Sequence, residues 1–279
     1  MSSRSGMQTE GEGPGSVIPK VIELRYKMCA TPMKIATWNV NGIRARESQL
    51  CDWLERDQPD VLCLQEIKAR PDQVPDRCKL ADYHAFWHGA GGYSGVSLHL
   101  RRELLDAPEF VHPEFDIETR IVQVALDNLV LASVYVPNGG KDYAAKLRFL
   151  QRMVDWTRTL RDEGRDLILC GDINIARTDA DVHPRERKPG IIGQRDEERV
   201  LFEALLDDSL TDVTRALDPD NNALFSWWPP WRDMRKRNIG WRIDYILASR
   251  RIAESATECR VLADIGTSDH APIMMTASI

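Results

Sequence analysis

Short apolar runs that alternate with amphipathic stretches are the feature that most constrains the fold of this chain. The apolar runs occupy positions 33–40, 60–65, 96–100, 120–126, 129–136, 166–170, 243–247 and 273–276. Short runs of this kind are typical of β-strands, and those that are apolar throughout indicate strands covered on both faces. Three longer stretches, 48–58, 142–163 and 197–207, carry apolar residues at helical spacing.

The connection between two of these runs favours a mixed fold rather than a purely parallel sheet. Asp127 and Asn128 separate the runs 120–126 and 129–136, which is a hairpin signal. Hairpins combined with strand–helix units are typical of sheets that pack together with helices outside. We therefore expect a single α/β sandwich domain over residues 33–279. Residues 1–32 are expected to form a flexible extension, because the stretch 11–19 offers little to pack.

Composition restricts the cellular setting. No apolar run is long enough, at about 18 residues, to predict a membrane-spanning helix. The first residues are polar and lack the apolar centre of a secretory signal. None of the six cysteines forms a CxxC pair, which argues against a structural zinc site, and Cys63 and Cys170 lie in apolar runs as buried thiols do. A reducing cytoplasm fits this chain best.

Charge alone does not identify a partner. The formal net charge of −6 argues mildly against a nucleic-acid ligand. The stretch 231–241 is locally basic, since it carries Arg232, Arg235, Lys236 and Arg237 against one acid. On charge alone, an ordinary solvated run of charges is the preferred interpretation of this stretch.

Polar side chains gather where several apolar runs end. They include amides, carboxylates, a tyrosine and a histidine, at Asn39, Asn41, Glu66, Tyr135, Asn138, Asp172, Asn174, Asp244, Asp269 and His270. Each alone is weak, because a turn or a cap accounts for a single Asn or Asp. Together they indicate a site, since strand ends hold ligand-binding groups on a rigid frame and this set contains almost no Ser or Cys nucleophile.

This set of side chains suits the cleavage of a phosphodiester. Glu66 and Asp269 offer hard oxygen ligands for Mg²⁺ or Mn²⁺, and the ion would neutralise the phosphate and the leaving oxygen. His270 beside a buried acid such as Asp244 would be oriented and kept basic. Asp172 would accept a proton from the attacking water.

Two further side chains complete this hypothesis. Asn174 would hold the water or the phosphate, and Tyr135 would donate a hydrogen bond to the phosphate.

Seven segments, in order, resemble the exonuclease III family of AP endonucleases within the DNase I-like endonuclease/exonuclease/phosphatase superfamily. They read WNVNGIRAR (38–46), LQEIK (64–68), GYSGV (92–96), VYVPNGG (134–140), GDINIARTD (171–179), WRIDYILAS (241–249) and SDHAP (268–272). A pair such as QE or DH would carry no weight alone, but seven ordered motifs that span nearly the whole chain from Met33 are specific.

The resemblance implies a four-layered α/β sandwich with the site at one edge of two facing mixed sheets. It implies Glu66 as the main metal ligand, with Asn39 and Asp269 near the same ion. The positions assigned in the family to water activation, transition-state contact and a debated second metal are matched by Asp172, Asn174 and His270. Asp244 matches the partner of that histidine, and Tyr135 matches the active-site tyrosine.

The resemblance also implies contacts with DNA. Arg44, Lys68, Tyr93, Asn138 and Lys141 match family residues that touch the DNA backbone or support the metal site. Trp227 and Trp241 match the apolar pocket that holds a flipped-out abasic sugar. Such a pocket needs bulky side chains to exclude a normal base.

Two departures from the family pattern concern the metal site and this pocket. Asn41 stands where the animal branch carries Asp, so the chain resembles the bacterial branch and its metal site has one charge fewer. The segment 180–199 lacks the Asn-rich pattern common in AP endonucleases, and His183 within it either enters the abasic pocket or is a surface residue before Pro184. Entry into the pocket would favour 3′-end processing over internal abasic cleavage.

The expected function is a Mg²⁺-dependent phosphodiesterase of base excision repair, with Mn²⁺ as a substitute. It would act on double-stranded DNA as an AP endonuclease, a 3′-phosphatase, a 3′-diesterase or a 3′→5′ exonuclease. We expect a cytoplasmic monomer without membrane contact, associated with the nucleoid in a bacterium. The alternatives are a superfamily phosphatase for a lipid or small-molecule phosphate ester and a dead DNA-binding relative. The last predicts losses at Glu66, Asp172 or His270, and none is lost.

Overall fold

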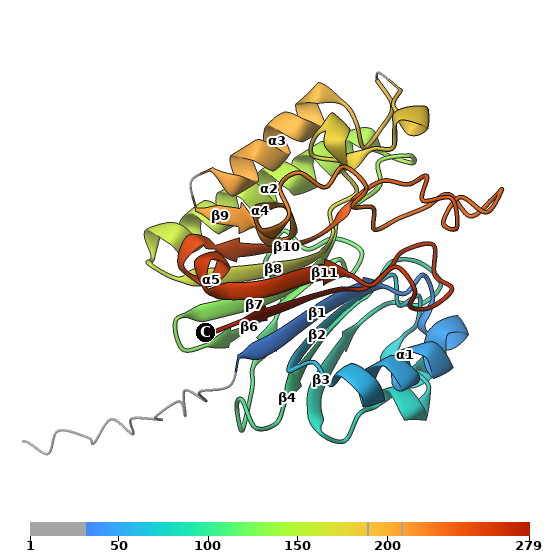
Figure 1. The fold of residues 1–279 in the computed structure, drawn as a ribbon. Helices are drawn as coiled ribbons and strands as arrows, with labels where there is room; N and C mark the ends of the chain where they lie inside the picture. Colours follow the sequence, from blue (N-terminus) through green and yellow to red (C-terminus); the bar gives the residue numbers. More distant parts are fainter. Residues whose placement is uncertain (1–31, 189, 208) are drawn as a thin grey trace, which may run out of the picture.

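Two six-stranded sheets face each other, and helices cover their outer faces (Figure 1). The computed structural model describes residues 32–188, 190–207 and 209–279, so the expected extension over 1–32 lies outside them apart from its last residue. The strand order is β11-β12-β1-β2-β4-β3 in the first sheet and β5-β6-β7-β8-β10-β9 in the second.

The first sheet contains β1 (Met33–Asn39), β2 (Val61–Gln65), β3 (Tyr83–His88), β4 (Val96–Arg101), β11 (Ala256–Val261) and β12 (Ile273–Ala277). The second contains β5 (Phe110–Val111), β6 (Ile121–Leu126), β7 (Leu129–Tyr135), β8 (Asp166–Asp172), β9 (Leu210–Asp212) and β10 (Asp244–Ser249). The helices are α1 (Ile43–Asp57), α2 (Tyr143–Asp162), α3 (Asp196–Leu206), α4 (Val213–Leu217) and α5 (Arg250–Ser255).

Three apolar clusters hold four layers together. The inner faces of the sheets meet in one cluster that contains Ile35, Val61, Leu131, Ile168 and Ile246. Leu50, Trp53 and Leu54 of α1 belong to a second cluster on the outer face of the first sheet. Side chains of α2 and α3 form a third with the outer face of the second sheet. The expected four-layered α/β sandwich is confirmed.

Parallel strand pairs bring the polar strand ends together. The β1–β2 pair is parallel and places Asn39 beside Gln65, while the parallel β7–β8 pair places Tyr135 beside Asp172. The antiparallel strand β10 begins at the same edge, with Asp244 beside Asp172. One edge of the sandwich therefore collects these side chains from both sheets.

Several boundaries differ from those predicted. The edge strands β3, β5, β9 and β11 were not predicted. β3 and β11 have mixed burial and show no continuous apolar run, and β5 and β9 are only two and three residues long. Helix α1 begins at Ile43 rather than at residue 48, directly after Gly42, whose φ is 100°. The hairpin prediction is confirmed, because Leu126 pairs with Leu129 across Asp127 and Asn128.

Two other predictions bear on the described chain. The five cysteines in it are all free and buried, including Cys63 and Cys170, and Cys29 lies outside it. Among the described residues, we find no helix of sufficient length and apolar character to cross a membrane.

Candidate active site

Asn39 joins the two sheets at the shared edge. Its Nδ2 donates to Oε1 of Glu66 and to Oδ2 of Asp172, each at 2.9 Å, and the side chain is fully buried. Glu66 follows β2 of the first sheet and Asp172 ends β8 of the second. A single amide thus sets the spacing of two carboxylates, which would otherwise repel each other.

The carboxylate of Glu66 is kept ionised by its neighbours. Burial acts to raise its pKa, but the hydrogen bond from Asn39 and the charges of His270 and Lys68 outweigh burial and lower it. Lys68 Nζ lies 2.7 Å from Glu66 Oε2 and 2.5 Å from Oδ1 of Asn41. Glu66 can therefore serve as an anionic metal ligand at neutral pH.

Asp269 is a further carboxylate in the lining of the site. Its Oδ1 accepts from Asn41 Nδ2 at 2.7 Å and its Oδ2 accepts from Trp227 Nε1 at 3.0 Å. Burial acts to raise its pKa, and the charge of His270 together with these two hydrogen bonds brings it below the usual value. Both oxygens are oriented by neutral donors, so the negative charge remains available to a cation.

His270 is held by a buried acid. Its Nδ1 lies 2.9 Å from Oδ2 of Asp244, which also accepts a hydrogen bond from Ser226 Oγ at 2.6 Å. Burial acts to lower the pKa of His270, but Asp244, Asp172 and Asp269 outweigh it and raise it to about 10. The imidazole is therefore positively charged at neutral pH in the free protein.

Asp172 and His270 face each other, with Oδ2 and Nε2 3.9 Å apart. Burial and the nearby charge of Asp244 raise the pKa of Asp172 to about 8, against the opposing effect of His270. One ligand atom from each of Glu66, Asp172 and His270 lies within 4.8 Å of the others, so the three could hold a metal ion if His270 gave up its proton. The oxygen-rich donor set is the kind that hard divalent cations prefer.

Asn174 and Tyr135 lie beside these three residues. Asn174 donates from Nδ2 to the carbonyl of Val136 at 2.8 Å, which leaves its amide oxygen free to point elsewhere. The pKa of Tyr135 is raised by burial and by the charges of Glu66 and Asp172, so its phenol remains a donor. The guanidinium of Arg120 lies 4.7 Å from the centre of the Tyr135 ring.

The backbone at the site is strained. Asn41, Glu66, Lys68 and Asn174 have φ angles of 45°, 50°, 51° and 56°, a region that residues other than glycine rarely adopt. Strain of this kind concentrates at functional sites, where the surrounding structure enforces it. At Gly171, just before Asp172, φ is 148° and a Cβ would lie 1.9 Å from the carbonyl oxygen of Val134, so only glycine fits.

The side chains surround a cavity of about 400 Å³. Its lining combines polar and apolar side chains, namely Glu66, Tyr135, Asn138, Asp172, Asn174, Ile192, Trp227, Trp241, Ile243, Asp269 and His270. Among the apolar ones, Trp227, Trp241 and Ile243 belong to one apolar cluster. The rings of Trp227 and Trp241 meet edge to face, 5.7 Å between centroids. A charged group and an apolar group of one ligand can therefore bind side by side.

The remaining residues expected to bind substrate do not line this cavity. Arg44 and Lys141 are exposed, and Tyr93 is 50% exposed. His183 is not among the residues that line the cavity: its Nδ1 accepts from the backbone N–H of Arg185, and its ring packs edge-on against Phe225. Its entry into the abasic pocket stays a prediction.

The basic stretch 231–241 is only partly available. Arg235 donates to the backbone carbonyls of Ala263, Ile265 and Ser268, so it holds a neighbouring loop. Arg232, Lys236 and Arg237 are exposed. The segment between α4 and β10 that carries them projects beyond the sheets (Figure 1).

Several supporting residues were not identified from the sequence. Arg120 contacts Tyr135, and Ser226 holds Asp244; neither carried a signal, since an Arg at a strand start and a Ser in a loop are common. Lys146 pairs with Glu198 at 2.5 Å, with both side chains 0% exposed. The sequence could have indicated that Lys146 is buried, because it lies at helical spacing from the apolar residues Phe149 and Leu150, which share its face of α2.

Comparison with known proteins places these features in one family. The model of the Endonuclease/Exonuclease/phosphatase family matches residues 36–270. An exodeoxyribonuclease of Bacillus subtilis is 32% identical over 257 residues, 88% of this chain and 100% of that protein. Exodeoxyribonuclease III of Haemophilus influenzae is also 32% identical, over 86% of this chain and 98% of that protein.

Solved structures of similar fold include nucleases of the same kind. A 3′-5′ exonuclease from Neisseria meningitidis superposes with a TM-score of 0.80 and 31% identity, over 88% of this chain and 99% of that chain. An AP endonuclease from Archaeoglobus fulgidus gives a TM-score of 0.79 and 27% identity, over 88% and 100% of the two chains. The chain thus belongs to the endonuclease/exonuclease/phosphatase family and, within it, to the group that contains exodeoxyribonuclease III and the AP endonucleases.

Proposed function

We propose that this protein is a metal-dependent phosphodiesterase that cleaves DNA at abasic sites or at blocked 3′ ends. The single observation that carries the proposal is the convergence of Glu66, Asp172 and His270 on one cavity beside an apolar wall. Relatives named as exodeoxyribonucleases and DNA repair nucleases support it, as does the structure of a related 3′ phosphatase from Neisseria bound to a product DNA hairpin.

The donor set fits Mg²⁺ better than a softer ion. Carboxylates of Glu66, Asp172 and Asp269 and the amide of Asn174 would supply oxygen ligands, and the described cavity contains no thiolate. Asn39 would lie near the same ion and hold two of these carboxylates through its amide nitrogen. Mn²⁺ accepts the same ligands. When bound, the ion would neutralise the phosphate and the leaving oxygen.

The protein's own groups would share the remaining chemistry. The pKa of Asp172 is raised to about 8 in the metal-free protein. The charge of a bound cation would lower this pKa, so that the ionised carboxylate could accept a proton from the attacking water. Protonated His270 would stabilise the negative phosphate, with Asp244 fixing the orientation of its ring. Asn174 would hold the water or phosphate, and the Tyr135 phenol would donate to a phosphate oxygen.

The apolar wall favours a DNA substrate. Trp227 and Trp241 would pack against the deoxyribose of an extruded abasic site, and their bulk would exclude a normal base. Asn138 in the cavity lining, and Arg44, Lys68, Tyr93 and Lys141 outside it, would contact the DNA backbone or support the metal site. A superfamily phosphatase for lipid or small-molecule esters would share the metal site but would not need these outer contacts.

One experiment tests the proposal directly. Purified protein is offered an internal abasic duplex, a 3′-phosphate nick, a recessed 3′ end and a small phosphate monoester in parallel, with Mg²⁺. Cleavage of at least one DNA substrate far above the monoester is expected. Preference for the monoester, or no hydrolysis of DNA, would overturn the proposal. The variant His183→Gly then distinguishes lesions: a higher ratio of abasic cleavage to 3′-phosphate removal would place His183 in the pocket.

Two broader expectations accompany this function. The protein is proposed to act as a monomer on double-stranded DNA, and its cytoplasmic location stays a prediction from the sequence.

A further inference from the structure

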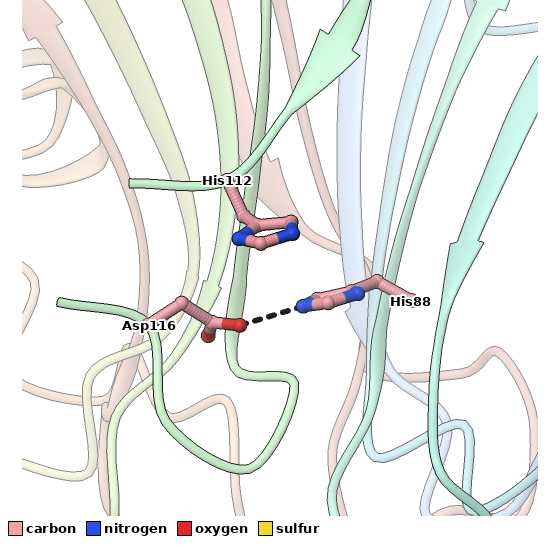
Figure 2. Close-up of side chains that lie close together, drawn as sticks. All are labelled: His88, His112 and Asp116. Atoms are coloured by element: carbon pink, nitrogen blue, oxygen red, sulfur yellow. Dashed lines mark hydrogen bonds and ion pairs between the residues drawn. The ribbon is translucent and has the colours of Figure 1, made fainter. Parts of the chain in front are cut away.

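A second group of metal-ligating side chains lies outside the cavity. His88 ends β3, His112 directly follows β5, and Asp116 lies four residues further along the chain. One ligand atom from each lies within 4.8 Å of the other two. Figure 2 shows the two imidazole rings side by side and the Asp116 carboxylate directed at His88. None of these residues lines the cavity described above.

The cluster joins the edges of the two sheets. Strand β3 is the last strand of the first sheet and β5 is the first strand of the second. Phe86 of β3 stacks on Phe110 of β5 at 5.7 Å, so the two edges are already in contact beside the cluster. A group that binds side chains from both edges would fasten the sheets together at this point.

His88 and Asp116 are held in place before any ion binds. Oδ1 of Asp116 accepts from the backbone N–H groups of Arg120 at 2.8 Å and Ile121 at 3.1 Å, and Oδ2 lies 2.6 Å from Nε2 of His88. The His88 ring stacks on His112 with a centroid distance of 4.8 Å and an interplanar angle of 13°. The side chains of His88 and Asp116 are 15% and 9% exposed, so they are shielded but reachable.

Two imidazoles and one carboxylate are a donor set that favours a borderline transition ion over Mg²⁺. Ligand atoms about 2.0–2.1 Å from a tetrahedral Zn²⁺ lie about 3.4 Å from one another. In the stacked arrangement the two rings lie in nearly parallel planes, so the exposed His112 ring would have to turn for its nitrogen to face the same ion as His88. The ion would also replace the short contact between His88 and Asp116. Water would occupy the fourth position.

We propose that His88, His112 and Asp116 bind one Zn²⁺-like transition ion, which clamps the edges of the two sheets. A chain of contacts would link the bound ion to the cavity. Asp116 fixes the backbone of Arg120, whose Nη2 donates to Tyr93 Oη at 2.9 Å and whose guanidinium packs on the Tyr135 ring. The ion would therefore act as a structural element, separate from the ion at Glu66.

The test measures Zn²⁺ binding by calorimetry and Co²⁺ binding by its visible absorption, on metal-stripped full-length protein. The variants are His112→Ala and His88→Gln in the cluster, Glu66→Gln in the cavity, and His84→Ala as a matched control on β3 outside the cluster. We expect a Zn²⁺ binding event that His84→Ala and Glu66→Gln retain, and that both cluster variants weaken by at least about 10².

Thermal unfolding provides the second readout, because an ion that binds only the folded state raises the melting temperature. Zn²⁺ should raise it in the wild type, in His84→Ala and in Glu66→Gln but not in His112→Ala, whose exposed side chain can be removed without loss of the fold. No Zn²⁺ binding in the wild type, or equal binding in His112→Ala, would overturn the proposal. Loss of Zn²⁺ binding in Glu66→Gln alone would assign the ion to the cavity instead.

Discussion

Nδ1 of His270 lies 2.9 Å from Oδ2 of Asp244, and this contact aims the opposite ring nitrogen at Asp172, 3.9 Å away. Both partners of the contact are buried, so the ring has one orientation. The positive charge of His270 depends on this arrangement, because burial alone would lower its pKa.

Replacement of Asp244 by Asn should therefore lower the pKa of His270 and reduce turnover by about 10² or more. The wild-type imidazole keeps its proton until the pH approaches about 10, so the alkaline fall in activity should occur at lower pH in Asp244→Asn. The measurement is the pH dependence of single-turnover DNA cleavage. Ser226→Ala is the matched control, since it removes one hydrogen bond to Asp244 but leaves the charge. An unchanged pH profile in Asp244→Asn would contradict the assigned role.

Replacement of Asp172 by Asn should reduce turnover by about 10² to 10⁴, the range for a positioned acid–base group. The melting temperature should fall only modestly, because Asn keeps the size of the side chain and one of the two acceptor oxygens that bind Asn39 and the backbone N–H of Asn174. Steady-state kinetics and thermal unfolding of the same sample provide both values. Retained turnover would remove Asp172 from the mechanism.

The buried pair Lys146–Glu198 holds the backbone of two residues that line the cavity, Asn174 and Gly193. Lys146 Nζ donates to the carbonyl oxygen of Asn174 at 2.8 Å, and Glu198 Oε2 accepts from the backbone N–H of Gly193 at 2.7 Å. Lys146→Met leaves a buried carboxylate unpaired and should lower the free energy of unfolding by about 3–5 kcal/mol. The double variant Lys146→Met/Glu198→Gln should recover much of this loss in urea unfolding. Equal losses in the single and the double variant would show that the pair is not coupled.

His99 should make stability depend on pH. It is fully buried in β4, and burial lowers its pKa to about 3. The unfolded chain binds a proton near pH 6.5 and the folded chain does not, so stability is complete above that pH and falls by about 1.4 kcal/mol per unit below it. His99→Leu should reduce the slope of unfolding free energy against pH between 6.5 and 4, whatever its effect at pH 7. The same slope in wild type and variant would refute this.

The apolar runs predicted the central strands well because these strands are buried on both faces. Strand β2, for example, reads VLCLQ and is buried throughout. Edge strands β3 and β11 were not predicted because only one of six residues in β3 and two of six in β11 are buried, which breaks the apolar pattern. An apolar run therefore identifies a strand only where its burial is nearly continuous.

The strand-end residues could be predicted as a group, but their geometry could not. Parallel pairing of β1 with β2 and of β7 with β8 decides that Asn39 meets Glu66 and Tyr135 meets Asp172, and no local pattern reports which strands pair. The roles of Arg120 and Ser226 depend on contacts across the chain and were therefore not visible in the sequence.

The account depends most on the claim that side chains from Asn39 to His270 converge on one cation and one phosphate. The most direct measurement is the rate of DNA cleavage against Mg²⁺ concentration, in chelator-stripped wild type and in Glu66→Gln. The account predicts no cleavage in chelator, recovery on addition of Mg²⁺, and a Mg²⁺ requirement raised by at least about 10-fold in Glu66→Gln. Full activity in chelator, or the same Mg²⁺ curve for both proteins, would contradict it.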